Sequence, residues 1–416
     1  MTEMWERFSF YGTRAILILY MVAATSTGGL GWSTAKAGLV YGIYTGSAYL
    51  TGIPGGWIAD NVLGARMAVV AGGICIAAGN ALLGLGSSDA LLFTGLVLMA
   101  IGTGLLKPNV STMVGALYSQ ADIRRDAGFS IFYMGINLGA TLSPLVCGWL
   151  AQRVGWRLGF WAACVGMIFG LIQYLLQQSQ LGDAGQKIKK IATAAASVVE
   201  PMTRSAWLRI GATGIFFFFS AIFWAAFEQA GSSLNLFAEQ LTRNEIFGFE
   251  FPSSWLQSVN AAFVILLAPV LSALWLKLAD RQPSSPVKFA LGLAGASAGF
   301  WVVMYAASLT GAGRVSVHWL LLVYLLHSLG ELCLSPVGLN ITTKLAPARV
   351  VGLMMGFWFA SIAAGNYAAG FIGGSFKADA TTLVPLFGWV AAVTLAASIV
   401  LLALTPFVKK LMGEVK

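Results

Sequence analysis

Seven charged side chains stand inside long apolar stretches of the sequence, where charge is unusual. They are Glu3, Glu6, Arg7, Arg14, Lys107, Glu228 and Glu331. If these stretches cross a lipid bilayer, each charge near a helix centre costs at least roughly 2.5–3.5 kcal/mol. Four acids against three bases nearly balance. The residues therefore predict a water-filled cavity lined by both signs of charge, which suits a zwitterionic ligand and whose carboxylates can carry protons.

The first of these stretches, TEMWERFSFYGTR, carries four of the seven charges. Arg7 follows Glu3 by four residues, and Tyr11 and Arg14 follow Arg7 by four and seven. These spacings put all four side chains on one face of a helix. Glu6 is adjacent to Arg7 and is expected to diverge from it. An alternative remains open for the acids: Glu3 and Glu6 could be solvated at the helix start, because only two residues precede Glu3.

The composition excludes a soluble globular protein. The chain has 416 residues, of which 58% are hydrophobic and only 10% are charged, and its mean hydropathy is +0.79. Soluble domains are about 25% charged. An enzyme is also disfavoured, because no nucleophile stands beside a base and no metal ligands have a workable spacing. Four cysteines fall in apolar runs and are expected to be buried hydrophobes: Cys75, Cys147, Cys164 and Cys333.

Apolar runs of about 20 residues, the length that spans a bilayer as a helix, occur twelve times. They cover 3–26, 34–59, 66–87, 90–118, 127–152, 157–178, 206–238, 254–279, 286–309, 317–344, 349–374 and 384–408. The polar segment 179–205 separates six runs from six. The sequence therefore predicts an all-α membrane protein with a six-helix bundle at 1–178, a linker at 179–205 and a second six-helix bundle at 206–416.

The basic residues favour one orientation of these helices. Sixteen Lys and Arg residues fall in the even-numbered loops and the C-terminal segment, and six fall in the odd-numbered loops. Basic loops stay in the cytoplasm, so we expect a multi-pass protein of the cell (inner) membrane with both termini cytoplasmic. The net charge of +9 is then a feature of topology, and no nucleic-acid partner is expected.

A weak internal repeat relates the two halves. The second apolar run ends in GGWIADNVLGAR and the eighth in LWLKLADRQPSSPVK. Both place an Ala-Asp pair, at Asp60 and Asp280, in an expected cytoplasmic turn that is followed by basic residues. Two similar six-helix halves joined by a polar linker are typical of the major facilitator architecture.

Five longer motifs give a more specific resemblance, to the proton-dependent oligopeptide transporter family of the major facilitator superfamily. They are the Glu-x-x-Glu-Arg-Phe run at 3–8, GTGLLKPNVS at 102–111, FYMGINLGATLSP at 132–144, FWAAFEQAGSSLNLF at 223–237 and GELCLSPVGLNITTKLAP at 330–347. The motifs lie on five expected helices and cover the whole chain in order. Two features differ from the family: members usually have several residues before the first motif, and many bacterial members carry two extra helices between the halves.

The resemblance implies a central site that binds both ends of a peptide. Its substrate-binding residues are Tyr11, Arg14, Tyr49, Lys107, Asn137, Trp224, Asn260, Glu331 and Trp358. Arg14 and Lys107 would hold the peptide carboxylate, and the fork of an Arg side chain suits a carboxylate because it donates two hydrogen bonds. Glu331, with Asn137 and Asn260, would hold the amine.

Simpler roles stay open for several of these residues. Trp224 and Trp358 would line pockets for peptide side chains, but tryptophans also serve as packing or interface residues. The two asparagines could join helices by hydrogen bonds. His327 lies one turn before Glu331 and could pass it a proton; a hydrogen bond from His327 to a neighbouring helix is the simpler interpretation.

The resemblance also implies how protons drive the cycle. Proton coupling would involve Glu3, Glu6, Arg7, Lys107 and Glu228, and gating would involve Arg14, Glu228, Lys107, Glu331 and Asp60. When the outer side is closed, Arg14 with Glu228 and Lys107 with Glu331 would form ion pairs between the two halves.

The expected function is therefore proton-coupled import of di- and tripeptides by alternating access. Protons would be the coupling ion, and no cofactor or metal is expected. The partners would be small peptides, including peptide-like drugs, and the lipid bilayer, with the chain acting as a monomer. Two alternatives remain open: the same fold could carry another substrate such as nitrate or a peptide-like drug, or it could export drugs in exchange for protons.

Overall fold

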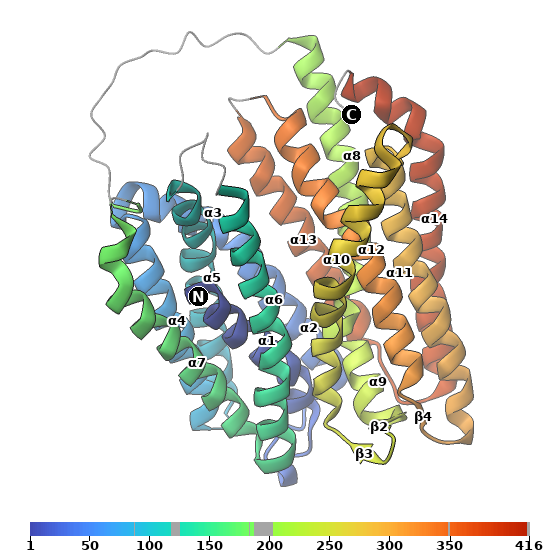
Figure 1. Ribbon diagram of the computed structural model, residues 1–416. Helices are drawn as coiled ribbons and strands as arrows, with labels where there is room; N and C mark the ends of the chain where they lie inside the picture. The colour runs from blue at the N-terminus through green and yellow to red at the C-terminus, as the bar shows by residue number, and fades with distance from the viewer. Residues whose placement is uncertain (87, 118–124, 183, 187–202, 348–349, 414–416) are drawn as a thin grey trace.

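Helices form two bundles that stand side by side in the computed structural model (Figure 1). It describes residues 1–86, 88–117, 125–182, 184–186, 203–347 and 350–413. The first bundle holds α1 (Thr2–Val22), α2 (Thr34–Leu50), α3 (Gly52–Ile58), α4 (Ala65–Leu85), α5 (Asp89–Ala116), α6 (Arg125–Trp149) and α7 (Trp156–Gln177). The second holds α8 (Arg204–Phe227), α9 (Ser233–Leu241), α10 (Gln257–Leu278), α11 (Ser285–Ser308), α12 (His318–Leu345), α13 (Val351–Gly374) and α14 (Ala380–Met412).

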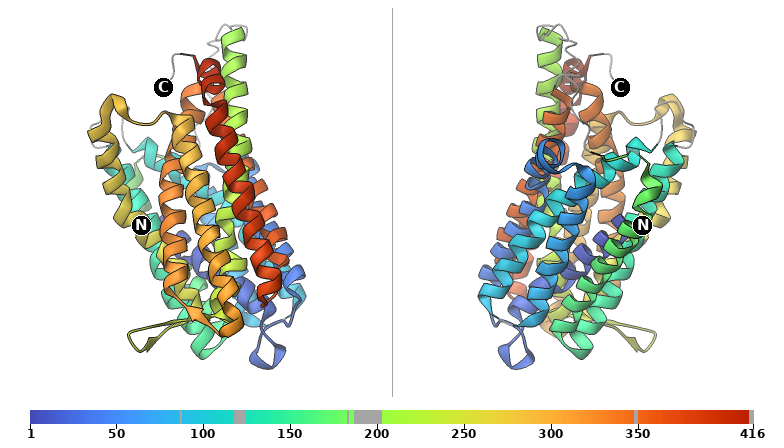
Figure 2. Two further views of the ribbon diagram at one scale, coloured as in Figure 1. Left: turned by 90° about the vertical axis from the view of Figure 1, so that its right-hand side faces the viewer. Right: turned by 90° about the vertical axis from the view of Figure 1, so that its left-hand side faces the viewer.

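Four two-residue strands mark one end of the molecule. They are β1 (Thr242–Arg243), β2 (Glu245–Ile246), β3 (Phe249–Glu250) and β4 (Val315–Ser316). β1 pairs in parallel with β4, and β2 pairs antiparallel with β3. We call this end of the bundles the strand end. The opposite end, where α7 stops and α8 begins, is the linker end (Figures 1 and 2).

The described helices cross twelve times, because α2 with α3 and α8 with α9 each make one broken crossing. The prediction of an all-α fold with two bundles of six crossings is confirmed. Within the described residues, nine helical segments are long and apolar enough to span a bilayer. The other three crossings are α1, with its four charges, the broken α2–α3 unit and α13. Parts of the predicted elements lie outside the described residues: positions 87, 118 and 349 at the ends of spans, and 187–202 of the linker.

Two crossings differ from the uninterrupted helices that we expected. The predicted span over 206–238 is found as one crossing, Arg204–Leu241, but a 3₁₀ turn at Glu228–Gly231 divides it into α8 and α9. The run over 34–59 is also interrupted, at Thr51, whose hydroxyl donates to the Ser47 carbonyl at 2.9 Å and to the Ala100 carbonyl of α5 at 2.7 Å. Hydropathy averaged over about 20 residues detects neither break, because most residues of both spans are apolar.

Glycines let α2 of the first bundle approach α13 of the second. A Cβ atom at Gly38 would lie 2.5 Å from the Gly374 nitrogen and 2.6 Å from the Gly370 carbonyl oxygen. A Cβ at Gly42 would lie 2.7 Å from the Gly370 Cα. Small residues allow membrane helices to gain contact area where hydrophobic driving force between helices is absent. The two bundles therefore meet backbone to backbone along this seam.

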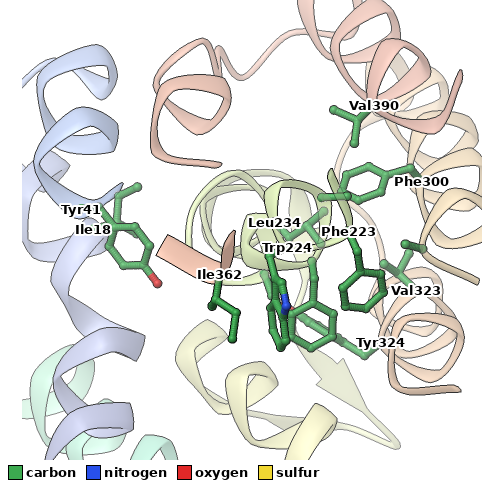
Figure 3. Packing of buried hydrophobic residues seen from close by; sticks show 14 of the residues in the cluster. Ile18, Tyr41, Phe223, Trp224, Leu234, Phe300, Val323, Tyr324, Ile362 and Val390 are labelled. Atoms are coloured by element: carbon green, nitrogen blue, oxygen red, sulfur yellow. The ribbon is translucent and has the colours of Figure 1, made fainter. Parts of the chain in front are cut away.

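Aromatic side chains of α8 fill the interior of the second bundle. Phe223 and Trp224 are in edge contact with ring centroids 5.4 Å apart, and Phe223 stacks on Phe227 at 5.5 Å. Figure 3 shows Phe223 and Trp224 beside Tyr324 of α12, while Tyr41 points from α2 toward the second bundle. This core positions α8 and α12, which carry Glu228 and Glu331 at their inner faces.

The glycine seam can be tested with two alanine substitutions of opposite expected effect. Gly38→Ala forces α2 and α13 apart and should destabilise the protein, because overpacking typically costs about 1–3 kcal/mol. Gly56→Ala is the matched control, since a Cβ there meets nothing within 4 Å and alanine is favoured over glycine in helices by about 0.5–1 kcal/mol. Thermal unfolding in detergent should give a lower midpoint for the first variant only; equal midpoints would contradict the seam.

Candidate functional site

An ion pair joins the two bundles near their centre. Arg14 Nη2 of α1 lies 2.6 Å from Glu228 Oε2 at the break between α8 and α9. Arg14 Nε also donates a hydrogen bond to the Tyr41 hydroxyl at 2.9 Å. The Arg14 and Glu228 side chains are only 10% and 2% exposed, so removing either leaves a buried charge, which typically costs about 3–5 kcal/mol. The contact predicted between Arg14 and Glu228 is formed.

The break between α8 and α9 makes room for this pair. A Cβ atom at Gly231 would lie 1.8 Å from the Tyr41 hydroxyl oxygen and 3.1 Å from Arg14 Nε. Any other residue at this position would displace the groups that hold the Arg14 guanidinium. Gly231 therefore belongs to the site through the space that it leaves empty.

A cavity of about 80 Å³ lies beside the ion pair, between the bundles. Its walls come from both halves: Tyr11, Arg14, Tyr49, Trp224, Phe227, Glu228, Ala230, Gln257, Asn260, Tyr324, His327 and Glu331. Six of the nine residues predicted to bind substrate are among them. The cavity thus combines a guanidinium, two carboxylates and aromatic rings in one enclosed space.

The Glu331 carboxylate has a polar partner but no ion-pair partner, although Arg14 lines the same cavity. Asn260 Nδ2 donates to Glu331 Oε2 at 3.1 Å and to the Ser328 hydroxyl at 2.9 Å. Among the described residues no Lys, Arg or His nitrogen lies within ion-pair distance of Glu331. Glu331 is partly buried, and a carboxylate that is withdrawn from water without a cation is costly. The site therefore favours either a proton on Glu331 or a positively charged ligand group beside it.

Three further charges form a second buried group, the α1 cluster of Glu3, Glu6 and Arg7. Arg7 Nε lies 3.2 Å from Glu3 Oε1 and also pairs with Glu6. All three residues are at most 3% exposed, so the alternative of solvated acids at the helix start is wrong. The expected divergence of Glu6 from Arg7 is wrong too. The long Arg7 side chain reaches both Glu6, its neighbour in the sequence, and Glu3, one helical turn earlier.

Lys107 lies apart from the Arg14 pair. Its Nζ is 4.2 Å from the centroid of the Tyr49 ring and 5.9 Å from that of Phe359. In the part of the chain described here, the predicted Lys107–Glu331 pair is absent. Lys107 and Tyr49 instead line a separate cavity of about 680 Å³, which extends along α3 to Asp60 and is bounded on the far side by α13.

Besides Lys107, two further predicted binding residues lie outside the central cavity. Trp358 is 2% exposed, and its ring packs on Phe217 at 6.2 Å, as the simpler interpretation of this tryptophan expected. Asn137 Nδ2 donates to the Tyr133 carbonyl of its own helix at 2.9 Å. In this conformation neither reaches Glu331, so their roles in binding stay predictions.

Several residues of the site were not predicted from the sequence, among them Tyr41, Gln257 and Tyr324. Gln257 Nε2 donates to the Ala230 carbonyl at 2.5 Å and to the Tyr324 hydroxyl at 3.4 Å. Spacing offered a signal for both tyrosines, because Tyr41 precedes Tyr49 by eight residues and Tyr324 precedes Glu331 by seven. Such spacings return to the same helix face. No local signal marks Gln257.

His327 keeps the simpler of its two predicted roles. Its Nε2 hydrogen-bonds to the Ala296 carbonyl of α11 at 3.2 Å, and its ring lies beside Phe300 at 5.1 Å. The ring also lines the central cavity. The hydrogen bond to a neighbouring helix is confirmed.

A polar latch closes the bundles toward the strand end. Gln152 of the first bundle donates to Glu239 Oε2 at 2.7 Å and to the Ser253 hydroxyl at 3.0 Å. The side-chain amide oxygen of Gln152, Oε1, accepts hydrogen bonds from the Ser254 backbone N–H at 3.1 Å and from the Ser254 hydroxyl at 2.5 Å. One amide side chain thus binds three residues of the second bundle.

The linker end is hollow by contrast. Besides the cavity at Lys107, cavities of about 470 and 870 Å³ open between α10, α11 and α12. A Cβ atom at Gly52, Gly56 or Gly352 would meet nothing within 4 Å. A central site closed toward one end and hollow toward the other can pass a ligand between the two sides of a membrane if the bundles rock about it.

Known proteins resemble this chain along its full length. The family model described as "POT family" matches residues 66–216 and 205–390. The peptide transporter YePEPT of Yersinia enterocolitica is 40% identical, with 100% of this chain and 94% of that protein covered. A di-/tripeptide transporter of Lactococcus lactis is 35% identical, with 100% and 95% covered.

Solved structures agree in fold. The crystal structure of a peptide transporter, POT, in complex with sulfate has a TM-score of 0.93 at 39% identity and covers 99% of this chain and 94% of its own. A POT family transporter in complex with 5-aminolevulinic acid has a TM-score of 0.90 at 31% identity, with 98% and 95% covered. These proteins are transporters rather than enzymes. The chain therefore belongs to the POT family, the proton-dependent oligopeptide transporters that its five motifs resemble.

Proposed function

We propose that this protein is a proton-coupled symporter that imports di- and tripeptides. The observation that carries the proposal is a central cavity in which Arg14 is held by Glu228 while Glu331 has no cation. A peptide in its zwitterionic form brings an ammonium group, which would supply the cation that Glu331 lacks, and a carboxylate, which would compete with Glu228 for Arg14. Uptake of radiolabelled dipeptide into proteoliposomes, with and without an inward proton gradient, tests the function directly.

We further propose that the linker end faces the cytoplasm. The loops at this end, with the C-terminal segment, hold sixteen of the Lys and Arg residues in the sequence and the other loops hold six, which favours this orientation in the inner membrane. The proposed units remain 1–178 and 206–416 for the two bundles and 179–205 for the linker, with the chain acting as a monomer. The structure described here then corresponds to an inward-facing state.

The count of buried charges explains why protons are needed. Four carboxylates and three cations sum to −1 when all are ionised. Arg14 compensates Glu228, and the α1 cluster has Lys107 within electrostatic reach as its second cation. Glu331 is left over. The empty protein therefore favours at least one bound proton, and an arriving peptide amine can replace it.

The peptide carboxylate would compete with Glu228 for Arg14. The guanidinium can donate two parallel hydrogen bonds to a carboxylate, so a peptide that takes this position leaves Glu228 buried and without its cation. A proton on Glu228 removes the resulting charge. Binding of the peptide carboxylate at Arg14 and protonation of Glu228 thus favour each other, and the loss of the Arg14–Glu228 contact frees the two bundles to move.

The remaining predicted residues take supporting roles in this proposal. Lys107 would attract the carboxylate as it passes, and the α1 cluster would offer further proton sites. Asp60, exposed at the linker end, would act in the gate there. Trp224, Phe227 and Tyr324 line the cavity with rings, which would accept varied peptide side chains while both peptide ends are held.

Two alternative functions fit less of this geometry. Nitrate has no positive group to satisfy Glu331. A drug exporter of lipophilic cations would have little use for Arg14 in the cavity wall. Other compact zwitterions and peptide-like drugs remain a second candidate, because a related transporter has been crystallised with alafosfalin at 39% identity.

Arg14→Ala should abolish concentrative dipeptide uptake, because it removes the guanidinium for the peptide carboxylate and leaves Glu228 unpaired. Lys36→Ala is the matched control: Lys36 pairs with Asp89 at 2.9 Å, but both side chains are about half exposed, and such surface pairs contribute at most about 1 kcal/mol. Uptake should be normal in this control. Normal uptake in the Arg14 variant, measured with equal amounts of inserted protein, would show that Arg14 does not bind the carboxylate.

Glu331→Gln should weaken binding of free dipeptides about ten- to hundredfold, because a charge-assisted hydrogen bond contributes about 1.5–3 kcal/mol. Dipeptides with a blocked N-terminus lack the ammonium group and should lose little. Competition against a labelled substrate measures both affinities in the same preparation. Equal losses for free and blocked dipeptides would mean that Glu331 does not recognise the amine.

Glu228→Gln should imitate a permanently protonated carboxyl group. Uptake driven by a proton gradient should stop, because no proton can be released at this position. Exchange of labelled for unlabelled dipeptide should persist, since exchange requires only that the loaded carrier reorient. Accumulation under a pH gradient would argue against an essential proton site, whereas loss of exchange as well would point to a role in binding or structure.

A further inference from the structure

Two contiguous cavities form one groove along α12, lined by α10, α11 and α14 of the second bundle and by Tyr133 of α6, where α10 stands apart from α14 toward the linker end (Figure 2). The deeper cavity, of about 470 Å³, has mainly apolar walls, including Leu271 of α10 and Leu332 and Leu339 of α12. The outer cavity has a volume of about 870 Å³. Both are lined by Lys288, Val337 and Asn340. The groove therefore runs without interruption from beside Glu331 to the linker end.

The outer cavity is cationic. Lys288 of α11, Lys344 of α12 and Lys409 of α14 line it together with Asp280. Three ammonium groups against one carboxylate leave a net charge of +2. Because the lysines come from three separate helices, their convergence on one cavity is a property of the fold rather than of a basic run in the sequence.

The start of α11 adds hydrogen-bond donors to this wall. Ser284 is the N-cap residue of α11, but its side chain makes no capping hydrogen bond. Its hydroxyl oxygen is buried and has no partner among the described residues, although Ser284 lines the cavity. Lys288 Nζ donates to Gln282 at 2.7 Å and has two further donors. Free donors at a helix N-terminus beside ammonium groups favour an anion with several oxygen acceptors.

The length of the groove matches half of a bilayer. Thirteen residues separate Glu331 from Lys344 on α12, which is about 20 Å of helix at 1.5 Å per residue. Half of a bilayer with its headgroups is also about 20 Å thick. A groove with an apolar inner part and a cationic outer part fits an amphiphile whose anionic group lies at the membrane surface.

The outer side of α10 is itself exposed to lipid. Only 11% of its most apolar segment is buried within the protein, and Leu266, Val270 and Leu276 are at least 62% exposed. An acyl chain can therefore enter the groove sideways from the bilayer. The apolar walls disfavour a peptide carboxylate as the occupant.

We propose that the groove between α10, α11 and α12 binds one phospholipid with an anionic headgroup. Its phosphate lies among Lys288, Lys344, Lys409 and Ser284, and one acyl chain follows the apolar walls toward Glu331. The lipid holds the end of α10 against α12 while the linker end is open. The groove meets the peptide cavity at Glu331, which lines both. The phosphate position lies at the linker end of the groove, and lipid binding there does not depend on the proposed transport activity.

Native mass spectrometry of the purified chain, delipidated and titrated with phosphatidylglycerol, tests the site. The double variant Lys344→Gln, Lys409→Gln should bind the first phosphatidylglycerol roughly thirtyfold more weakly. Each surface Lys attracts an anionic lipid by about the same free energy, so the two substitutions contribute equal factors to this loss. Lys410→Gln is the matched control, because Lys410 is as exposed as its neighbour Lys409 but does not line the cavity. It should bind like the unmodified chain.

A second variant tests the apolar part of the groove. Leu339→Trp fills the path of the acyl chain, leaves every lysine in place and should also weaken phosphatidylglycerol binding. Equal weakening by Lys410→Gln would overturn the proposal in favour of diffuse surface charge. Equal binding of phosphatidylcholine would overturn the anionic headgroup, and full displacement of the lipid by inorganic phosphate would reduce the site to a phosphate site without a lipid.

Discussion

A charge in the middle of a membrane protein must be matched by another charge, by a proton or by a ligand, and the architecture of this transporter follows from that constraint. The Arg14–Glu228 pair meets it with one charge from each bundle. Neither bundle can satisfy its own charge when the two separate. The pair therefore links the conformation of the whole protein to whatever else can neutralise either partner, namely a carboxylate at Arg14 or a proton at Glu228.

The contacts between the two bundles differ between the strand end and the linker end. Toward the strand end, the glycine seam of α2 and α13 brings backbones together, and the latch around Gln152 joins polar side chains, including the Glu239 carboxylate, by hydrogen bonds. These contacts are short and directional, so they are either made or lost. Toward the linker end, cavities separate the helices, and no ion pair joins the two bundles there among the residues that the structure describes. Such asymmetry lets the bundles rock about the central site without unfolding either one.

Glu331 shows how an incomplete site can be useful. A buried carboxylate that already had a cation would gain little from a ligand amine, because the ligand would have to displace that cation. Glu331 has instead a neutral partner in Asn260, at 3.1 Å. The amide keeps the side chain in place, and the missing charge is left for a proton or a substrate to supply.

Much of this architecture can be predicted from the sequence, because burial in a membrane constrains each helix separately. Each span must be apolar for about 20 residues, so the twelve crossings and the seven buried charges can be read one helix at a time. The spacing of Glu3, Arg7 and Arg14 likewise placed them on one helix face. Tertiary structure decided which side chains meet across helices. It turned Lys107 to Tyr49 and brought Tyr41 and Gln257 to the site. It also broke α8 from α9 where Gly231 leaves space for Tyr41. Periodicity fixes the direction in which a side chain leaves its own helix, but the partner that it finds depends on how closely and at what height the next helix packs.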